Sequence, residues 1–118
     1  MKSFPNKAIG AKRNYTLGFS NLPAGVTITS CSVTAVVRDE STVPDTNPSA
    51  ILNGDAQTNA VATTVCGAPL GAHLAVIQSI WQGVVGCTYL LTFTVTLSNA
   101  EVIVEEYSLY VSKYAPRS

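Results

Sequence analysis

The chain has 118 residues, which is the length of one domain. Charged residues make up only 12% of it, hydrophobic residues make up 47%, and the formal net charge is zero. A neutral chain does not favour nucleic acid as its main partner, because phosphate binding needs a surplus of basic residues. A surface this poor in charge is weakly protected against association, so we expect part of it to be buried in an assembly.

Residues 1–12 show no apolar alternation and carry three lysines without an acid. Such a segment buries too little surface of its own to be ordered in isolation. We therefore expect an extended N-terminal arm that binds a partner subunit, with a tail that has no role as the alternative. Its candidate partner-binding residues are Lys2, Phe4, Lys7, Ile9 and Lys12. The folded domain is expected over residues 13–114, followed by a C-terminal tail over 115–118.

The first strand is predicted over residues 13–20, where apolar Tyr15, Leu17 and Phe19 alternate with polar or small residues. A second, long strand over residues 26–37 changes the parity of its apolar positions part-way along. Because a shift of one residue exchanges the faces of a strand, this pattern predicts a β-bulge near Thr29 and Ser30.

A polar loop is predicted over 38–49, followed by a short edge strand over 50–52. Residues 61–65 read as another strand, and 68–71 as a turn. Strands are then predicted over 74–81, 87–97 and 101–112. The alternation over 87–97 is the clearest in the chain and is typical of an antiparallel sheet with one wet face. It predicts that Phe93 is among the most buried residues.

No segment has a convincing helical period. About seven short strands separated by turns predict an all-β, Ig-like antiparallel β-sandwich. The paired cysteines around a buried tryptophan that mark immunoglobulin domains do not occur in that order.

Little in the sequence points to catalysis, so we expect a protein that is not an enzyme and needs no cofactor. Glu105 and Glu106 are strand neighbours that point to opposite faces, and the single histidine, His73, lies beside a turn. Three cysteines and this histidine are the residue types of a Cys₃His zinc site, but they lack the close pair of ligands that such sites use. We expect no metal, and we expect Cys31, Cys66 and Cys87 to be free thiols; an intermolecular disulfide is the alternative.

Trp81 leaves two interpretations open. It either caps the core at a corner of the sheet or serves as a possible interface anchor, since tryptophan is enriched at binding hot spots.

Three sequence blocks resemble small proteins encoded with the head genes of tailed bacteriophages. They are residues 14–28, with the strand and turn of Tyr15 to Gly25, residues 48–54, and the Gly83–Leu91 hairpin element. The chain departs from this family at Gly18 and Phe19, where an acid and a tryptophan are common, and at Ala100, where the family usually has glycine. The resemblance implies an Ig-like virion structural protein and carries no catalytic residues.

We therefore expect a capsid decoration, or cement, protein that binds the major capsid protein and is itself homo-oligomeric. A neck, tail or fibre-attachment protein is the alternative, and a carbohydrate-binding module is a third. The sequence shows no signal peptide and no span long enough for a membrane, so we expect synthesis in the host cytoplasm, incorporation into the virion, and neither nucleic acid nor membrane as a partner.

Overall fold

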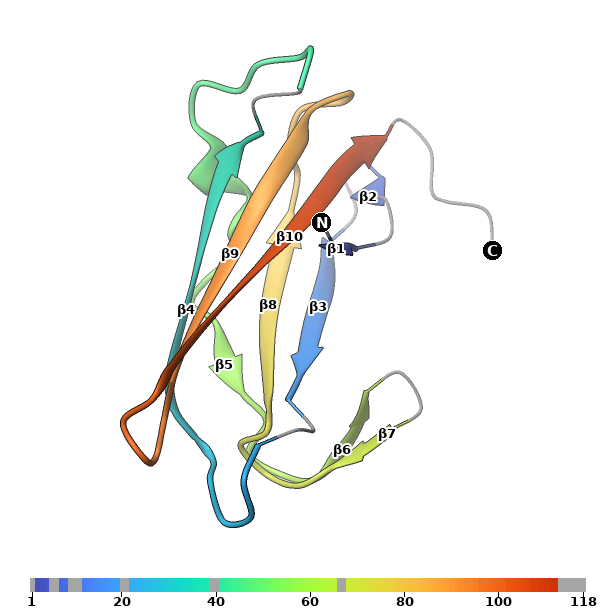
Figure 1. Cartoon of the computed structure of the whole chain (residues 1–118). Helices are drawn as coiled ribbons and strands as arrows, with labels where there is room; N and C mark the ends of the chain where they lie inside the picture. Colours follow the sequence, from blue (N-terminus) through green and yellow to red (C-terminus); the bar gives the residue numbers. More distant parts are fainter. Residues whose placement is uncertain are drawn as a thin grey trace.

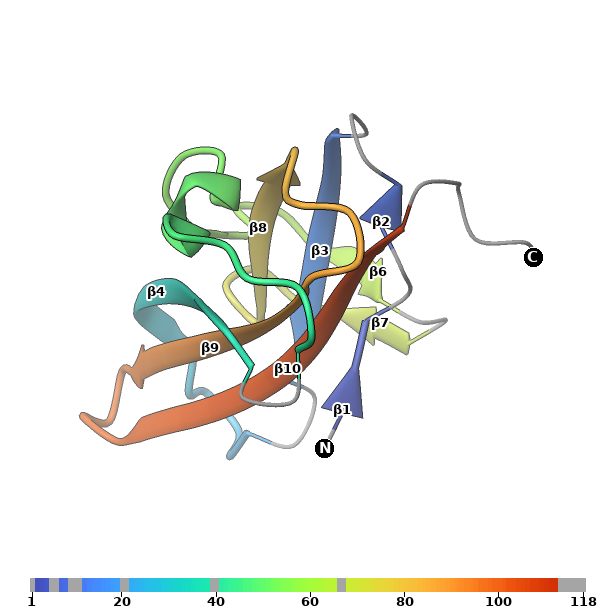
Figure 2. The same ribbon diagram turned by 90° about the horizontal axis from the view of Figure 1, so that it is seen from above.

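The structure is a β-sandwich, seen in a computed structural model (Figure 1). The residues that it describes are 2–4, 7–8, 12–19, 22–38, 41–65 and 68–112. Two sheets form separate layers when the molecule is viewed from above (Figure 2). The all-β sandwich predicted from the sequence is confirmed.

The first sheet contains the three longest strands, β4 (Ile28–Val37), β9 (Thr88–Leu97) and β10 (Val102–Ser112). They pair antiparallel in the order β10-β9-β4. The register between β4 and β9 shifts between Ile28 and Ser30. The predicted bulge is therefore confirmed, and it turns both halves of the apolar pattern of β4 toward the core.

The second sheet is formed by β3 (Lys12–Gly18), β8 (Ala75–Trp81) and β5 (Gln57–Thr58). A separate hairpin joins β6 (Thr63–Val65) to β7 (Ala68–Leu70). The turn predicted over 68–71 is thus wrong in part, because residues 68–70 pair as a strand.

The edge strand predicted over 50–52 is also wrong in part. Pro48–Ile51 forms a 3-10 turn, η1, with proline in its first turn, where the fixed φ of proline suits a helical start. Only Leu52 makes a β-bridge, to Ile80, on the edge of β8 that also pairs with β5.

The core lies between the two sheets. Along β9 the odd-numbered residues are buried and the even-numbered ones half-buried, as the alternation predicts. Phe93 is 0% exposed, so its predicted burial is confirmed. The main contributors from the opposite sheet are Tyr15, Leu17, Val76 and Ile80.

The N-terminal segment corrects the expectation of an arm outside the domain. Lys2–Ser3 (β1) and Lys7–Ala8 (β2) pair parallel with β10 of their own chain. The Phe4 ring stacks on the Tyr107 ring with a centroid distance of 4.5 Å, and its centroid lies 4.9 Å from that of Tyr15. The described residues of this segment are held because β10 pairs with them and because Phe4 and Lys7 pack against their own domain. Neither can be read from residues 1–12 alone.

Candidate binding surfaces

The outer face of the β4–β9–β10 sheet consists mostly of hydroxyl and β-branched side chains. The cross-strand register places Ser32 and Val104 on either side of Thr94, and Thr34 and Glu106 on either side of Thr92. Outward positions alternate along each strand. The residues of this face, which we call the outer face, are Ser30, Ser32, Thr34, Val36, Thr88, Leu90, Thr92, Thr94, Thr96, Val102, Val104, Glu106, Ser108, Tyr110 and Ser112.

Large apolar side chains on the outer face are strongly exposed. Val102 is 59% exposed, Val104 58%, Val36 48% and Tyr110 40%. This feature was not predicted from the sequence, although the uninterrupted run Val102-Ile103-Val104 indicates a strand that is apolar on both faces. The register places Val102 and Val104 toward one end of the face and Val36 and Tyr110 toward the other. Exposed apolar side chains gathered on one sheet face are typical of an interaction surface.

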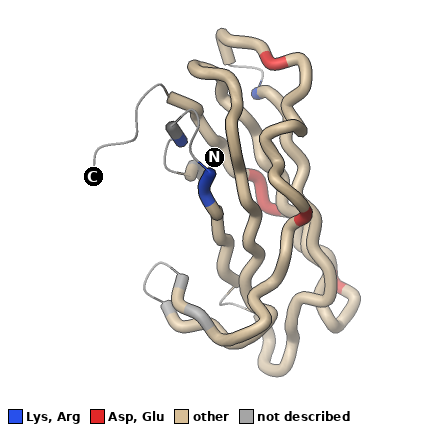
Figure 3. The backbone as a smooth tube through the Cα atoms, turned by 180° about the vertical axis from the view of Figure 1, so that it is seen from behind, with Lys and Arg blue, Asp and Glu red and all other residues tan. Residues whose placement is uncertain are grey.

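Charge is nearly absent from the outer face. Glu106 is the single charged side chain among its outward strand positions, all of which the structure describes. Arg38 follows β4, and its Nη1 donates to Ser108 Oγ at 3.2 Å, so it reaches across the end of the face. Lysine, arginine and acidic residues colour only short stretches of the chain in Figure 3. A partner would bury this face without leaving many charges unpaired.

Trp81 belongs to the other sheet. The residue is 40% exposed, and Lys12 Nζ lies 4.5 Å from the centroid of its ring in a cation–π contact. The register pairs the two residues directly across β3 and β8. Lys12 is therefore a strand residue with a partner in its own domain, which corrects its assignment to the arm. Trp81 remains available as an interface anchor.

The other predicted arm residues differ in where the structure places them. Phe4 packs against the aromatic rings described above, and Lys7 is 0% exposed with Nζ donating to Gln82 O at 2.8 Å. Burial, with the nearby Arg13 adding to it, lowers the pKa of Lys7. Neither side chain is presented to a partner in this structure. Lys2 is described only as part of β1, and Ile9 lies outside the described residues.

Two of the three cysteines are described. Cys31 is half-buried and Cys87 is buried, and both are free thiols; Cys66 lies outside the described residues. Burial raises the pKa of Cys31. Among the described residues, no group of three histidine, cysteine or acidic side chains is placed to hold a metal ion. His73 Nδ1 lies 2.9 Å from Thr58 Oγ1 in an exposed turn.

A buried tyrosine ties two loops together at one end of the sandwich. Tyr89 Oη donates to Asp45 Oδ2 at 2.6 Å and accepts from Val84 N at 2.9 Å. Burial, together with the bond to Asp45, raises the pKa of Tyr89. Both hydrogen bonds hold loop backbone or loop side chains in place, so we interpret this network as structural.

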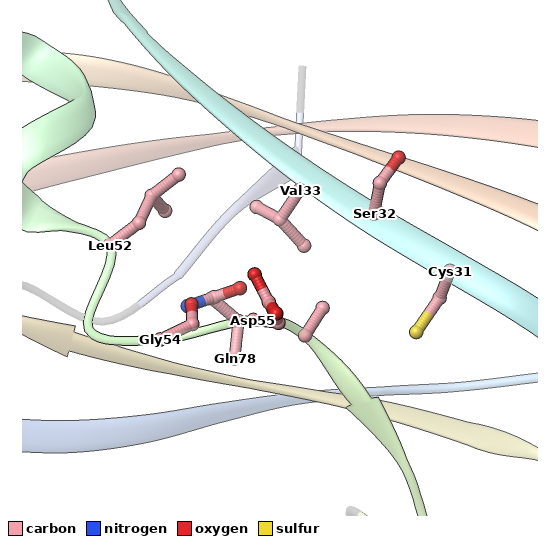
Figure 4. Close-up of a pocket in the computed structure, with 8 residues that line it drawn as sticks. Cys31, Ser32, Val33, Leu52, Gly54, Asp55 and Gln78 are labelled. Atoms are coloured by element: carbon pink, nitrogen blue, oxygen red, sulfur yellow. The ribbon is translucent and has the colours of Figure 1, made fainter.

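A groove of about 560 Å³ separates β4 from the chain between η1 and β5 (Figure 4). Its lining combines apolar Val33, Leu52 and Ala56 with the polar side chains of Asp55 and Gln78. The Gln78 side chain rises from β8 toward β4. The groove joins segments far apart in the sequence, and β5 is too short to stand out as a strand, so no sequence pattern could have indicated it.

Comparison with protein-family models gives no match, and comparison with curated proteins gives none either. Over the described part of the chain, no helix has the length and apolar character needed to cross a membrane.

Proposed function

We propose that the protein is a virion structural protein of a tailed bacteriophage that decorates the capsid by binding the major capsid protein. The observation that carries the binding role is the outer face, where exposed valines stand among hydroxyl side chains with a single outward charge. The phage context comes from the resemblance of residues 14–28, 48–54 and 83–91. Incorporation into the virion belongs to the same proposal.

A sheet face of this composition suits a subunit interface. Burying valine and threonine side chains removes apolar area from water, and the hydroxyls can pair with a partner's backbone. The alternative, a carbohydrate-binding module, would need several aromatics on one face. Tyr110 and Trp81 are the exposed large aromatics of the described residues, and they lie on different sheets. The protein-binding function is therefore better supported.

The test measures binding to heads of the encoding phage from which this chain has been removed. The double variant Val102→Lys and Val104→Lys places two cations in the interface. We expect its affinity in co-sedimentation to fall at least about tenfold, because the partner must desolvate both charges. The matched control, Asn14→Lys with Gln57→Lys, adds the same charge at exposed positions of the other sheet.

Unchanged loading of the double valine variant would contradict the proposal. Loading lost equally in both variants would show a charge effect without a specific face, and would contradict it too. The number of copies bound per particle separates the two structural assignments. Many copies on the shell support a cement protein, and a small ring supports the neck or tail alternative.

A further inference from the structure

The β4 strand leaves one edge of its sheet without a strand partner among the described residues. Arg38 N donates to Thr88 O, so this pair is a hydrogen-bonded one. In an antiparallel ladder such pairs recur every second residue, which turns the backbone groups of Cys31, Val33 and Ala35 away from β9. Within the described chain, no residue bonds to these outward groups.

This edge lacks most of the features that block strand addition. Ile28–Val37 contains no charged residue and no proline, and its bulge lies at one end. The opposite edge of the same sheet is covered, because β1 and β2 lie along β10. Long, uncharged edges are templates for a further strand. The groove runs beside the open edge, which is that of β4.

Two acceptors in the groove have no donor among the described residues. Gln78 is 1% exposed, and its Nε2 donates to Gly54 O at 3.1 Å and to Ser79 O at 2.8 Å. Because both partners are carbonyl oxygens, the orientation of the amide is fixed and Oε1 is left as an acceptor without a partner in the part of the chain that the structure describes. The Asp55 carboxylate lines the same groove and is exposed. Neither Oε1 nor the Asp55 carboxylate receives a hydrogen bond from a described residue.

We propose that this groove binds an extended segment of a partner protein, which pairs with β4 and inserts a lysine side chain between Asp55 and Gln78. The segment would bond to the outward backbone groups of β4. The aliphatic part of the lysine would lie along Val33, Leu52 and Ala56, and its ammonium group would donate to the two free acceptors. The negative groove complements the positive side chain. The inference rests on the proposed function in that it names what a partner subunit contributes.

The probe is the blocked peptide acetyl-Thr-Val-Lys-Val-Thr-amide, titrated into isotope-labelled protein and followed by NMR. We expect shifts at the amides of Cys31, Val33 and Ala35 and at the side-chain amide of Gln78. A peptide with norleucine in place of lysine should bind about fivefold more weakly, because it keeps the strand pairing and loses the charge. Asp55→Asn should weaken the lysine peptide by a similar factor and leave the norleucine peptide unchanged. Glu106→Gln, on the outer face, is the matched control and should change neither affinity.

Equal affinity for the two peptides would overturn the proposal, as would shifts along β10 or an absence of shifts at millimolar peptide. Shifts of the same β4 amides with protein concentration alone would identify a second copy as the occupant and would also overturn it, since β4 carries no lysine. These outcomes are independent of particle loading by the outer-face variants. A failed peptide titration with normal valine-dependent loading therefore rejects the groove alone, and the reverse result rejects the capsid function alone.

Discussion

Phe93 lies where the first sheet meets the N-terminal segment. It is 0% exposed, with Phe4 and Tyr107 in edge-on contact at centroid distances of 5.8 Å and 5.9 Å. Aromatic pairs in this geometry add to the stability from burial. Phe93 therefore connects β9 to the N-terminal segment.

Phe93→Ala should lower the free energy of unfolding by about 3–5 kcal/mol, because it leaves a cavity bordered by two aromatic rings. Thr94→Ala, on the outward side of the same strand, should cost less than about 1 kcal/mol. Both values come from denaturant unfolding. A loss under about 1 kcal/mol for the phenylalanine variant would contradict the assignment of the core face.

Lys7 makes the stability depend on pH. Its pKa is lowered from 10.5 by burial, with Arg13 contributing, so between the folded-state pKa and 10.5 the unfolded chain binds more protons at this site than the folded one. Stability must rise with pH wherever the unfolded state holds the extra proton. Tyr15 and Tyr89, whose pKa values are raised by burial, contribute a slope of the opposite sign to the wild type and to Lys7→Met alike. We therefore expect the stability of the wild type relative to Lys7→Met to rise as pH approaches 10.5. Unfolding free energies measured across that range would contradict the prediction if the two curves stayed parallel.

At the scale of elements, the N-terminal segment behaves as part of the sheet. It contributes two short parallel pairings and one aromatic side chain, which packs between Tyr107 and Tyr15. A parallel pairing of two residues is weak without such an anchor.

Phe4→Ala should therefore cost about 2–3 kcal/mol, less than a fully buried phenylalanine because Phe4 is half-buried. Phe4→Leu keeps an apolar side chain at this position and should cost under about 1.5 kcal/mol. Deletion of residues 2–8 should destabilise the domain at least as much as Phe4→Ala. Thermal unfolding that is unchanged by the deletion would restore the interpretation of a separate arm.

The β9–β10 connection holds a residue in a strained conformation. Ala100 has φ of 71°, a left-handed value that costs a non-glycine residue about 1–2 kcal/mol. Glycine takes this backbone conformation without the steric cost of a Cβ.

Ala100→Gly should raise the free energy of unfolding by about 1 kcal/mol, because the relief of strain exceeds the added freedom of the unfolded chain. Ala24→Gly, in a turn where alanine does not take a positive φ, should lower it by about 0.5–1 kcal/mol. If both glycine variants lost the same free energy of unfolding, the strain at Ala100 would be absent in solution.

At the scale of the whole molecule, low charge and an apolar outer face act together. The formal net charge is zero at pH 7 and the sequence pI is about 6.5. Close to this pH, little repulsion opposes association through exposed valines. In isolation the protein should therefore associate most readily close to its pI, and a partner subunit would compete with that association.

Solubility in polyethylene glycol should pass through a minimum close to pH 6.5. The Val102→Lys and Val104→Lys variant should be more soluble there and should have its minimum at a higher pH, since it gains two positive charges. The Asn14→Lys and Gln57→Lys control should move the minimum in the same way with a smaller gain in solubility. Equal gains would mean that the valine face does not drive association.

The sequence by itself determined the all-β class, the long strands, the bulge in β4 and the burial of Phe93, because these follow from an alternation with a period of two residues. Only the tertiary structure decided what lies beside each strand. Residues 1–12 look unable to fold when judged alone, yet β10 and Tyr107 order Phe4 and Lys7. The groove likewise exists only where β4, β8 and the segment before β5 converge. Alternation is a local property of a strand, whereas edges, slots and grooves arise from pairings between distant segments.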